Sequence, residues 1–288
     1  MQRLEFKGRN DLALVADALG DERALPILMF PGGGQTRRSW QRTAEALADR
    51  GYRAIAVDLR GHGESAWATD GDYSIAAFTE DIASVVRALD KPPVVIGASI
   101  GGVAATIALG EHTPLPARAL VLVDIVPRAR TDGVEKIRSF MRTGLDGFES
   151  PEEAAKQVTA YLPHRPPRTV ESLAANLRQG TNGRWYWHWD PAFQQNSKTR
   201  RDEDMFTRMQ SAASAIEIPI LLVTGQRSEV VDESTAKSFL ASLHNGRWVS
   251  VADAAHMVAG DANTPFSASI LDFVESLPKH CGDSGAPI

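Results

Sequence analysis

Short apolar runs rich in valine and isoleucine recur along the chain, separated by polar turns and amphipathic stretches. Most of these runs end at a glycine, a proline or an aspartate. A run of this kind is typical of a strand that is buried on both faces, as in a parallel sheet. The predicted strands are Leu12–Leu19, Ile27–Phe30, Ala54–Val57, Val94–Ile96, Ala119–Val123, Ile220–Val223 and Trp248–Val251.

Amphipathic stretches with helical spacing alternate with these strands. In Ile75–Leu89, for example, apolar residues recur at the three- and four-residue intervals of one helix face. Strands that alternate with helices predict an α/β fold with a parallel sheet covered on both faces. The predicted helices of this layer are Trp40–Arg50, Ile75–Leu89, Val103–Leu109, Ser234–Leu243 and Phe266–Leu277.

The alternation stops between residues 128 and 215, where the pattern predicts helices and no strand. This insertion carries a net charge of +3, whereas the rest of the chain carries −8. We therefore expect a core of residues 1–127 and 216–278, an inserted unit at 128–215 and a frayed tail at 279–288. The predicted helices of the insertion are Gly133–Met141, Pro151–Tyr161 and Thr169–Gly180.

Composition and charge exclude several classes of partner. The net charge of −5 argues against nucleic acid, and no apolar run reaches the length of a membrane span. The first residues lack the apolar core of a signal peptide, and the single cysteine, Cys281, cannot form an internal disulfide, so we expect a cytoplasmic protein. Histidine and cysteine show no metal-ligand spacing, so neither a metal nor another cofactor is expected, and nothing indicates an oligomeric state.

The most informative motif follows the predicted strand Val94–Ile96. Gly97-Ala98-Ser99-Ile100-Gly101 has the form G-x-S-x-G and precedes a predicted helix. A serine on a tight turn between a strand and a helix is the arrangement called a nucleophile elbow. We interpret Ser99 as a nucleophile; otherwise it would cap the helix.

A serine hydroxyl needs a general base, and two histidines follow predicted strands. His256 comes soon after the strand Trp248–Val251, and His62 follows Ala54–Val57 between two glycines. Loops after parallel strands meet at one edge of the sheet, so His256 can approach Ser99 despite their separation in sequence. We favour His256 as the base, because the glycines beside His62 suggest a role in a turn.

The base in turn needs an acid that orients it. Glu229 follows the strand Ile220–Val223, and Asp124 directly follows Ala119–Val123. Both fit the chain order serine, acid, histidine. We favour Glu229, keep Asp124 as the alternative acid, and note Asp232 as a weaker third candidate.

The tetrahedral oxyanion of an acyl transfer needs two N–H donors. The amide of Ile100, next to the nucleophile, is one candidate. The second is expected in the loop Gly32-Gly33-Gly34 after the strand Ile27–Phe30, with Gly33 preferred. This loop lacks the lysine of a phosphate-binding loop, which argues against nucleotide binding.

The order of these motifs resembles the α/β-hydrolase superfamily, in particular the capped branch of serine esterases and haloperoxidase-like hydrolases. The similarity rests on the glycine loop, Asp58–Ser65, Gly97–Gly102 and the region of His256. It covers nearly all of 1–127 and 216–278. It implies a mostly parallel central sheet of about eight strands, with helices on both faces and a helical cap at 128–215.

Two positions depart from the pattern of that family. Pro31 stands before the glycine loop where the family commonly has histidine, and Glu229 stands nearest the place of the usual aspartate. Some similar esterases instead carry the aspartate after the sixth strand and a serine near position 228. The resemblance therefore keeps Asp124 and Ser228 as candidates.

A serine at the elbow, where related epoxide hydrolases and dehalogenases use aspartate, favours acyl transfer. The resemblance implies a serine hydrolase that cleaves a small carboxylic ester or thioester through an acyl-serine. A carbon–carbon bond hydrolase or a perhydrolase could use the same residues, and a ligand receptor or a cofactor-free dioxygenase could use the same fold.

The cap is expected to shape the substrate pocket. Its aromatic cluster Trp185–Trp189 could either line that pocket or pack the cap against the core, and we favour packing. Trp185 and Trp187 are the candidates for substrate contact. The cap arginines Arg165 and Arg168 could attract an anionic substrate, although a solvated helix face is the simpler interpretation.

Overall fold

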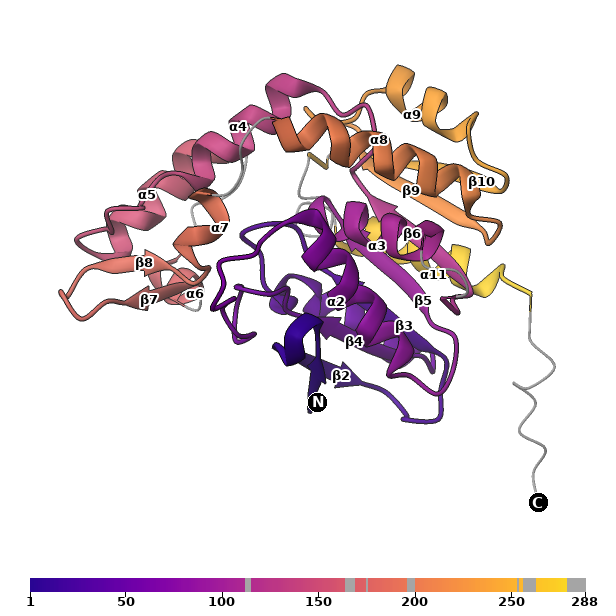
Figure 1. Ribbon diagram of the computed structural model, residues 1–288, viewed down its shortest axis with the longest axis horizontal. Coiled ribbons are helices and arrows are strands. Elements are labelled where there is room, and N and C mark those ends of the chain that lie inside the picture. Colours follow the sequence, from indigo (N-terminus) through magenta and orange to yellow (C-terminus); the bar gives the residue numbers. More distant parts are fainter. Residues whose placement is uncertain are drawn as a thin grey trace.

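A twisted sheet of eight strands forms the centre of the molecule (Figure 1). The computed structural model describes residues 1–111, 115–163, 169–174, 176–195, 200–252, 254–255 and 263–278. The order in the sheet is β1-β2-β4-β3-β5-β6-β9-β10. The strands are β1 Gln2–Lys7, β2 Ala13–Leu19, β3 Pro26–Phe30, β4 Arg53–Val57, β5 Val94–Ala98, β6 Ala119–Val123, β9 Ile220–Gly225 and β10 Gly246–Val251.

The sheet is mostly parallel, as predicted. The six strands from β4 to β10 pair in parallel, and β1 and β2 add an antiparallel edge. The sequence pattern did not predict β1. Its residues alternate between exposed and half-buried, with only Leu4 and Phe6 packed on the core, so it lacks the continuous apolar run of the inner strands.

Helices cover both faces of the sheet. Successive residues of a strand point to opposite faces, so Leu28 packs in one core cluster and Ile27 in the other. One face carries α2 Ile75–Arg87, α3 Ile100–Glu111, α8 Arg200–Ala215 and α9 Glu233–Leu240. The other carries α1 Gln41–Asp49 and α11 Asn263–Glu275, and two short 3₁₀ turns, η1 Arg9–Asp11 and η2 Arg37–Trp40, lie in loops. Among the described residues, no helix combines the length and the apolar character that a membrane span needs.

The insertion stands to one side of the sheet with an apolar core of its own (Figure 1). It contains α4 Thr131–Met141, α5 Pro151–Tyr161, α6 Val170–Ala174, β7 Leu177–Gln179, β8 Trp185–Trp187 and α7 Pro191–Gln195. The expectation that the insertion lacks strands was wrong. The helix predicted over Thr169–Gly180 ends at Ala174, and β7 and β8 form an antiparallel pair. The turn between them has Gly183 at φ +79°, which the Asn182-Gly183 dipeptide supplies.

The last helix of the insertion, α8, packs on the core. Met209 and Ala212 are buried in the same apolar cluster as residues of α2, α3 and α9. Helices α3 and α8 lie so close together that a Cβ on Gly110 would overlap the Ala212 backbone. We therefore propose that the cap ends before α8, rather than at residue 215. The predicted tail, 279–288, lies outside the described residues.

Candidate active site

Ser99 lies on a sharp turn between β5 and α3. Its φ is +48°, a left-handed conformation that is costly for a residue with a side chain. The turn is tight: a Cβ on Gly97 would overlap the backbone of Gly101, and one on Gly101 would overlap the carbonyl of Pro31. The Ser99 side chain lines a cavity between the sheet edge and the cap. The strained serine therefore faces a space that can hold a small molecule.

The glycine loop after β3 lies beside this serine. A Cβ on Gly32 would approach the Ser99 Cβ to 3.2 Å. The Gln35 side chain holds the loop from within, because its Oε1 accepts a hydrogen bond from Gly32 N at 3.1 Å. The N–H groups of Gly33 and Ile100 donate to no residue in the part of the chain that the structure describes. Both amides are therefore available to an oxygen atom held near Ser99.

Asp124 lies beside Ser99, at the carboxyl end of the neighbouring strand β6. Ala98 and Val123 are paired in the sheet, and Ser99 N donates to Val123 O at 3.3 Å. The Asp124 carboxylate is fully buried. Its Oδ2 accepts from Ser228 Oγ at 2.6 Å and its Oδ1 from Gly225 N at 3.2 Å. Asp124 and Ser228 thus form one buried polar group beside the serine.

Glu229, the acid favoured from the sequence, points elsewhere. Its side chain is 57% exposed and forms an ion pair at 2.7 Å with Lys136 of α4. The Ser228 hydroxyl accepts hydrogen bonds from Val230 N and Val231 N, which turns the chain so that Ser228 faces inward and Glu229 outward. Asp232, the third candidate, caps α9 through Thr235. The geometry therefore favours Asp124 over both as a partner for a base near Ser99.

His256 lies outside the described residues. The chain is described as far as Ala255, and Arg227 N donates to Ala254 O at 2.8 Å. A Cβ on Gly225 would overlap the carbonyl oxygens of Ala254 and Ala255. The residue before His256 thus lies against Gly225, whose own N–H binds Asp124.

His62, the competing base, is fully buried and does not belong to the cavity lining. Its Nδ1 contacts the carbonyl oxygen of Arg60 at 2.9 Å. A carbonyl only accepts, so Nδ1 carries the proton. Within the described chain, His62 Nε2 has no hydrogen-bond partner.

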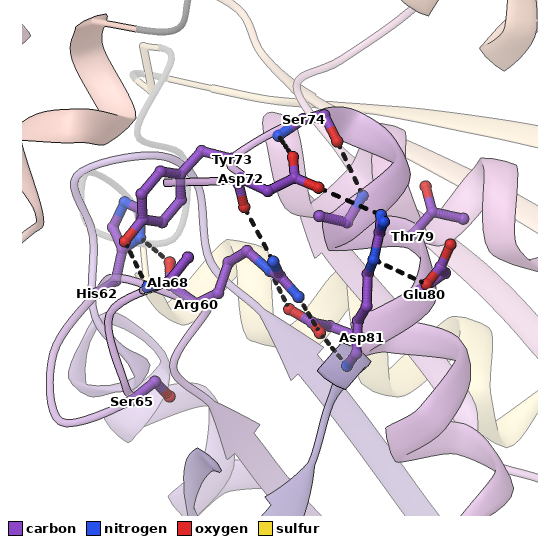
Figure 2. Close-up of polar contacts among 12 residues, drawn as sticks. Arg60, His62, Ser65, Ala68, Asp72, Tyr73, Ser74, Thr79, Glu80 and Asp81 are labelled. Carbon is purple, nitrogen blue, oxygen red and sulfur yellow. Dashed lines mark hydrogen bonds and ion pairs between the residues drawn. The ribbon is translucent and has the colours of Figure 1, made fainter. Parts of the chain in front are cut away.

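The loop that carries His62 is fixed by a buried ion pair (Figure 2). The Arg60 guanidinium donates from Nε and Nη2 to the two carboxylate oxygens of Asp81, at 2.6 and 2.7 Å, and from Nη1 to the Asp72 carbonyl. Ala68 N donates to the Tyr73 hydroxyl at 2.9 Å. These hydrogen bonds fix the conformation of the loop that carries His62 and Tyr73.

Two buried histidines, His62 of the core and His188 of the cap, are expected to make the protein less stable in acid. Burial lowers the pKa of His62 to about 4 and that of His188 to about 3. Below pH 6.5 the unfolded chain binds protons that the folded chain refuses, so the free energy of unfolding falls as the pH falls. We expect each histidine to remove about 2 kcal/mol by pH 5.

Urea unfolding of the wild type and of His62→Gln at pH 7.5 and pH 5 measures this effect. The variant should lose about 2 kcal/mol less than the wild type over this interval. Carboxylates such as Asp58 and Asp81 titrate in both proteins and cancel in the comparison. An identical pH dependence in the two proteins would show that His62 does not titrate as expected.

The cavity has a volume of about 450 Å³ and is mostly apolar. Cap and core side chains both line it, and they include Ile75, Val103, Ile125, Val134, Ile137, Phe140, Met141, Tyr161, Trp189, Phe193, Met205 and Phe206. In the described part of the chain, no group of three or more His, Cys, Asp or Glu residues could hold a metal ion.

The aromatic cluster divides between packing and lining. Trp189 lines the cavity, whereas Trp185 and Trp187 do not belong to the lining. Trp187 is buried in the core of the cap, and its Nε1 donates to Thr143 O. Its ring stacks on that of Trp189, with the ring centroids 5.2 Å apart. Trp185 pairs with Phe148 across an isolated bridge. Of the three tryptophans, Trp189 is therefore the one that faces the cavity. Arg165 and Arg168 lie outside the described residues.

The chain is similar in sequence to known hydrolases. Residues 26–262 match the family model of the alpha/beta hydrolase fold. The esterase Rv0045c of Mycobacterium tuberculosis is 33% identical over 226 residues, which cover 76% of this chain and 72% of the esterase. The 3-hydroxybutyrate-oligomer hydrolase of Cupriavidus necator is 27% identical over 247 residues, which cover 81% of this chain and 83% of that protein.

Solved structures are similar over almost the whole chain. A solved structure of the M. tuberculosis esterase Rv0045c matches with a TM-score of 0.73 and 28% identity, and covers 96% of this chain and 91% of the esterase. The structure of E-2-(acetamidomethylene)succinate hydrolase matches with a TM-score of 0.82 and 19% identity, over 96% and 99% of the two chains. At that identity the second match shows the shared fold.

Proposed function

Because this chain belongs to the α/β-hydrolase fold family, we propose that it is a serine hydrolase of small carboxylic esters or thioesters, acting through an acyl-serine. The observation that carries the proposal is the strained Ser99, which lines an apolar cavity between two available amide groups and a buried carboxylate. Similarity to two ester-cleaving hydrolases supports the same class of reaction.

In the acylation half of the proposed reaction, Ser99 Oγ attacks the acyl carbonyl carbon while His256 takes its proton. The N–H groups of Gly33 and Ile100 stabilise the oxyanion. When the tetrahedral intermediate collapses, the leaving alcohol or thiol receives the proton from His256 and the acyl group stays on Ser99.

In the second half, water releases the acid product. His256 accepts a proton from the water as its oxygen attacks the acyl-serine carbonyl, and Ser99 Oγ regains that proton on leaving. The same two amides bind the second oxyanion. These steps need no redox partner.

We assign the orienting acid to Asp124, in place of Glu229. A carboxylate that orients an imidazole must be held still and screened from water. Asp124 meets this need through burial and its hydrogen bonds to Ser228 and Gly225. Glu229 is more than half exposed and paired with Lys136. Ser228 is then a positioning residue for the carboxylate.

The cavity supports an apolar acyl or alcohol group on the substrate. Its lining combines aliphatic and aromatic side chains from both cap and core. The described lining contains two cations, Arg138 and Arg208, and one anion, Asp204. Arg208 is paired with Glu111 at 2.7 Å, and Arg138 has an interaction partner of its own. A neutral ester with a hydrocarbon chain therefore fits the lining better than a highly charged substrate.

An ester series tests the proposal. With p-nitrophenyl esters from acetate to decanoate, we expect kcat/KM to rise with chain length and to pass through an optimum at intermediate length, because each buried methylene contributes about 0.8 kcal/mol until the cavity is filled. A fluorophosphonate should stop turnover: the Ser99 oxygen displaces fluoride, and the peptide that contains Ser99 gains the mass of the reagent less that of HF. Absence of both turnover and labelling would exclude the acyl-serine mechanism, and labelling at another serine would exclude Ser99.

A further inference from the structure

The segment from His188 to Phe193 joins the cap to two loops at the active edge of the sheet. Asp190 N donates to Gly61 O at 2.9 Å, and the Tyr73 hydroxyl donates to Asp190 Oδ2 at 2.5 Å. The Phe193 ring packs edge-on against His62, with the ring centroids 4.8 Å apart. The segment therefore packs on the loop that carries His62 and Tyr73, whose internal hydrogen bonds are drawn in Figure 2.

His188 extends this contact to the glycine loop. Its Nδ1 accepts a hydrogen bond from Gly63 N at 2.8 Å, and its Nε2 lies 3.3 Å from Gly34 O. A backbone N–H only donates, so Nδ1 is unprotonated and the proton of the neutral ring is on Nε2. Nε2–H therefore donates to the Gly34 carbonyl. The ring is 7% exposed, and burial keeps its pKa low, which preserves this tautomer at neutral pH.

The glycine loop needs support from outside itself. Three consecutive glycines have no side chains to fix their conformation, and Gly34 adopts φ +74°. Gln35 holds Gly32 from one side. On the other side the contacts come from the cap: Phe193 lies against Gly33, and Trp189 and Met141 lie against Gly34. The hydrogen bond from His188 is the directional contact of this set.

We propose that His188 is a positioning residue, which holds the Gly32–Gly34 loop in the conformation that presents the Gly33 N–H to the oxyanion. This inference rests on the proposed function, since it concerns the oxyanion hole of that reaction. It makes the cap a part of the catalytic machinery as well as a cover, because a cap residue fixes a backbone donor of the core.

Two substitutions separate the two hydrogen bonds of His188. In His188→Asn the amide oxygen stands where Nδ1 is, so the bond to Gly63 is kept and the donor to Gly34 is lost. In His188→Gln the amide N–H stands where Nε2 is, so the donor to Gly34 is kept. Arg178→Met is the matched control, because it removes a different contact between cap and core, that of the Arg178 guanidinium with the ring of Trp67, together with its contact with the ring of Tyr186 on the cap.

The measurements are kcat and KM on the best p-nitrophenyl ester, the affinity for a trifluoromethyl ketone that forms a tetrahedral adduct with a serine, and Tm. For His188→Asn we expect kcat to fall about 10- to 100-fold with KM within about threefold of the wild type, and ketone affinity to fall in proportion to kcat. His188→Gln should recover most of both losses. Arg178→Met should change Tm without changing kcat.

Three results would overturn the inference. The first is a His188→Asn variant with normal kcat and lowered Tm, which would leave His188 a docking residue only. The second is a raised KM with unchanged kcat, which would indicate a substrate contact. The third is an equal loss in both His188 variants. If the wild type neither hydrolyses esters nor reacts with a fluorophosphonate, the proposed function fails and the inference falls with it.

Discussion

Replacement of Ser99 by alanine is expected to lower kcat on the best p-nitrophenyl ester by about 10⁵-fold or more, with little change in Tm. Without the hydroxyl no acyl-enzyme forms, and only the oxyanion hole and binding remain. Alanine fits the site, since the hydroxyl is the sole group removed. The backbone strain at φ +48° is the same for alanine as for serine, so the free energy of unfolding should change little.

The rate is measured at an enzyme concentration high enough to detect a trace of wild-type contamination. Fluorophosphonate labelling of the same samples measures the fraction of wild-type enzyme in them. Ser269→Ala is the matched control. Ser269 lies on α11, on the other face of the sheet, where its hydroxyl bonds to the Pro265 carbonyl, so this variant should keep full activity. A Ser99→Ala enzyme that retains more than about one hundredth of the rate would refute an acyl-serine.

The second large effect concerns the acid. Asp124→Asn is expected to lower kcat by about 10³- to 10⁴-fold, because an amide favours the wrong tautomer of the base and cannot stabilise its protonated form. Asparagine has nearly the shape of aspartate, and its amide oxygen can still accept from Gly225 N, but its amide nitrogen cannot accept from the Ser228 hydroxyl. Tm measured beside kcat separates the chemical effect from unfolding.

Glu229→Gln is the matched comparison and should keep kcat within about twofold of the wild type. It removes an exposed ion pair with Lys136, which contributes at most about 1 kcal/mol to stability. Both variants replace one carboxylate with an amide, after the neighbouring strands β6 and β9. The reverse result, a large loss in Glu229→Gln and none in Asp124→Asn, would return the acid to Glu229.

The choice between these two carboxylates illustrates a limit of sequence reasoning. Both follow predicted strands and both fit the chain order. What separates them is the direction in which the loop after β9 turns. That direction is set by the hydrogen bonds that Val230 N and Val231 N donate to the Ser228 hydroxyl, and by the hydrogen bond from this hydroxyl to Asp124. A preference for Glu229 from its place in the chain could not include those contacts. The serine at 228 was the available signal.

The cap shows a similar division. The helices Gly133–Met141 and Pro151–Tyr161 were anticipated closely, because each has clear periodicity and ends near a breaker. The β7–β8 pair was missed although Asn182-Gly183 is a strong turn signal, since two three-residue strands give almost no alternation. No sequence pattern pointed to His188, whose partners Gly34 and Gly63 are far away in the chain.

The sequence by itself determined the α/β architecture, the buried inner strands and the serine turn. These depend on local properties: continuous apolar runs, helical periodicity, and glycines where a side chain would collide with the backbone. Only the tertiary structure decided which carboxylate faces inward, that α8 packs on the core, that Trp189 and not Trp187 lines the cavity, and that a cap histidine reaches the glycine loop. Those features depend on contacts between segments distant in sequence, and the energy of such a contact is not encoded in either segment alone.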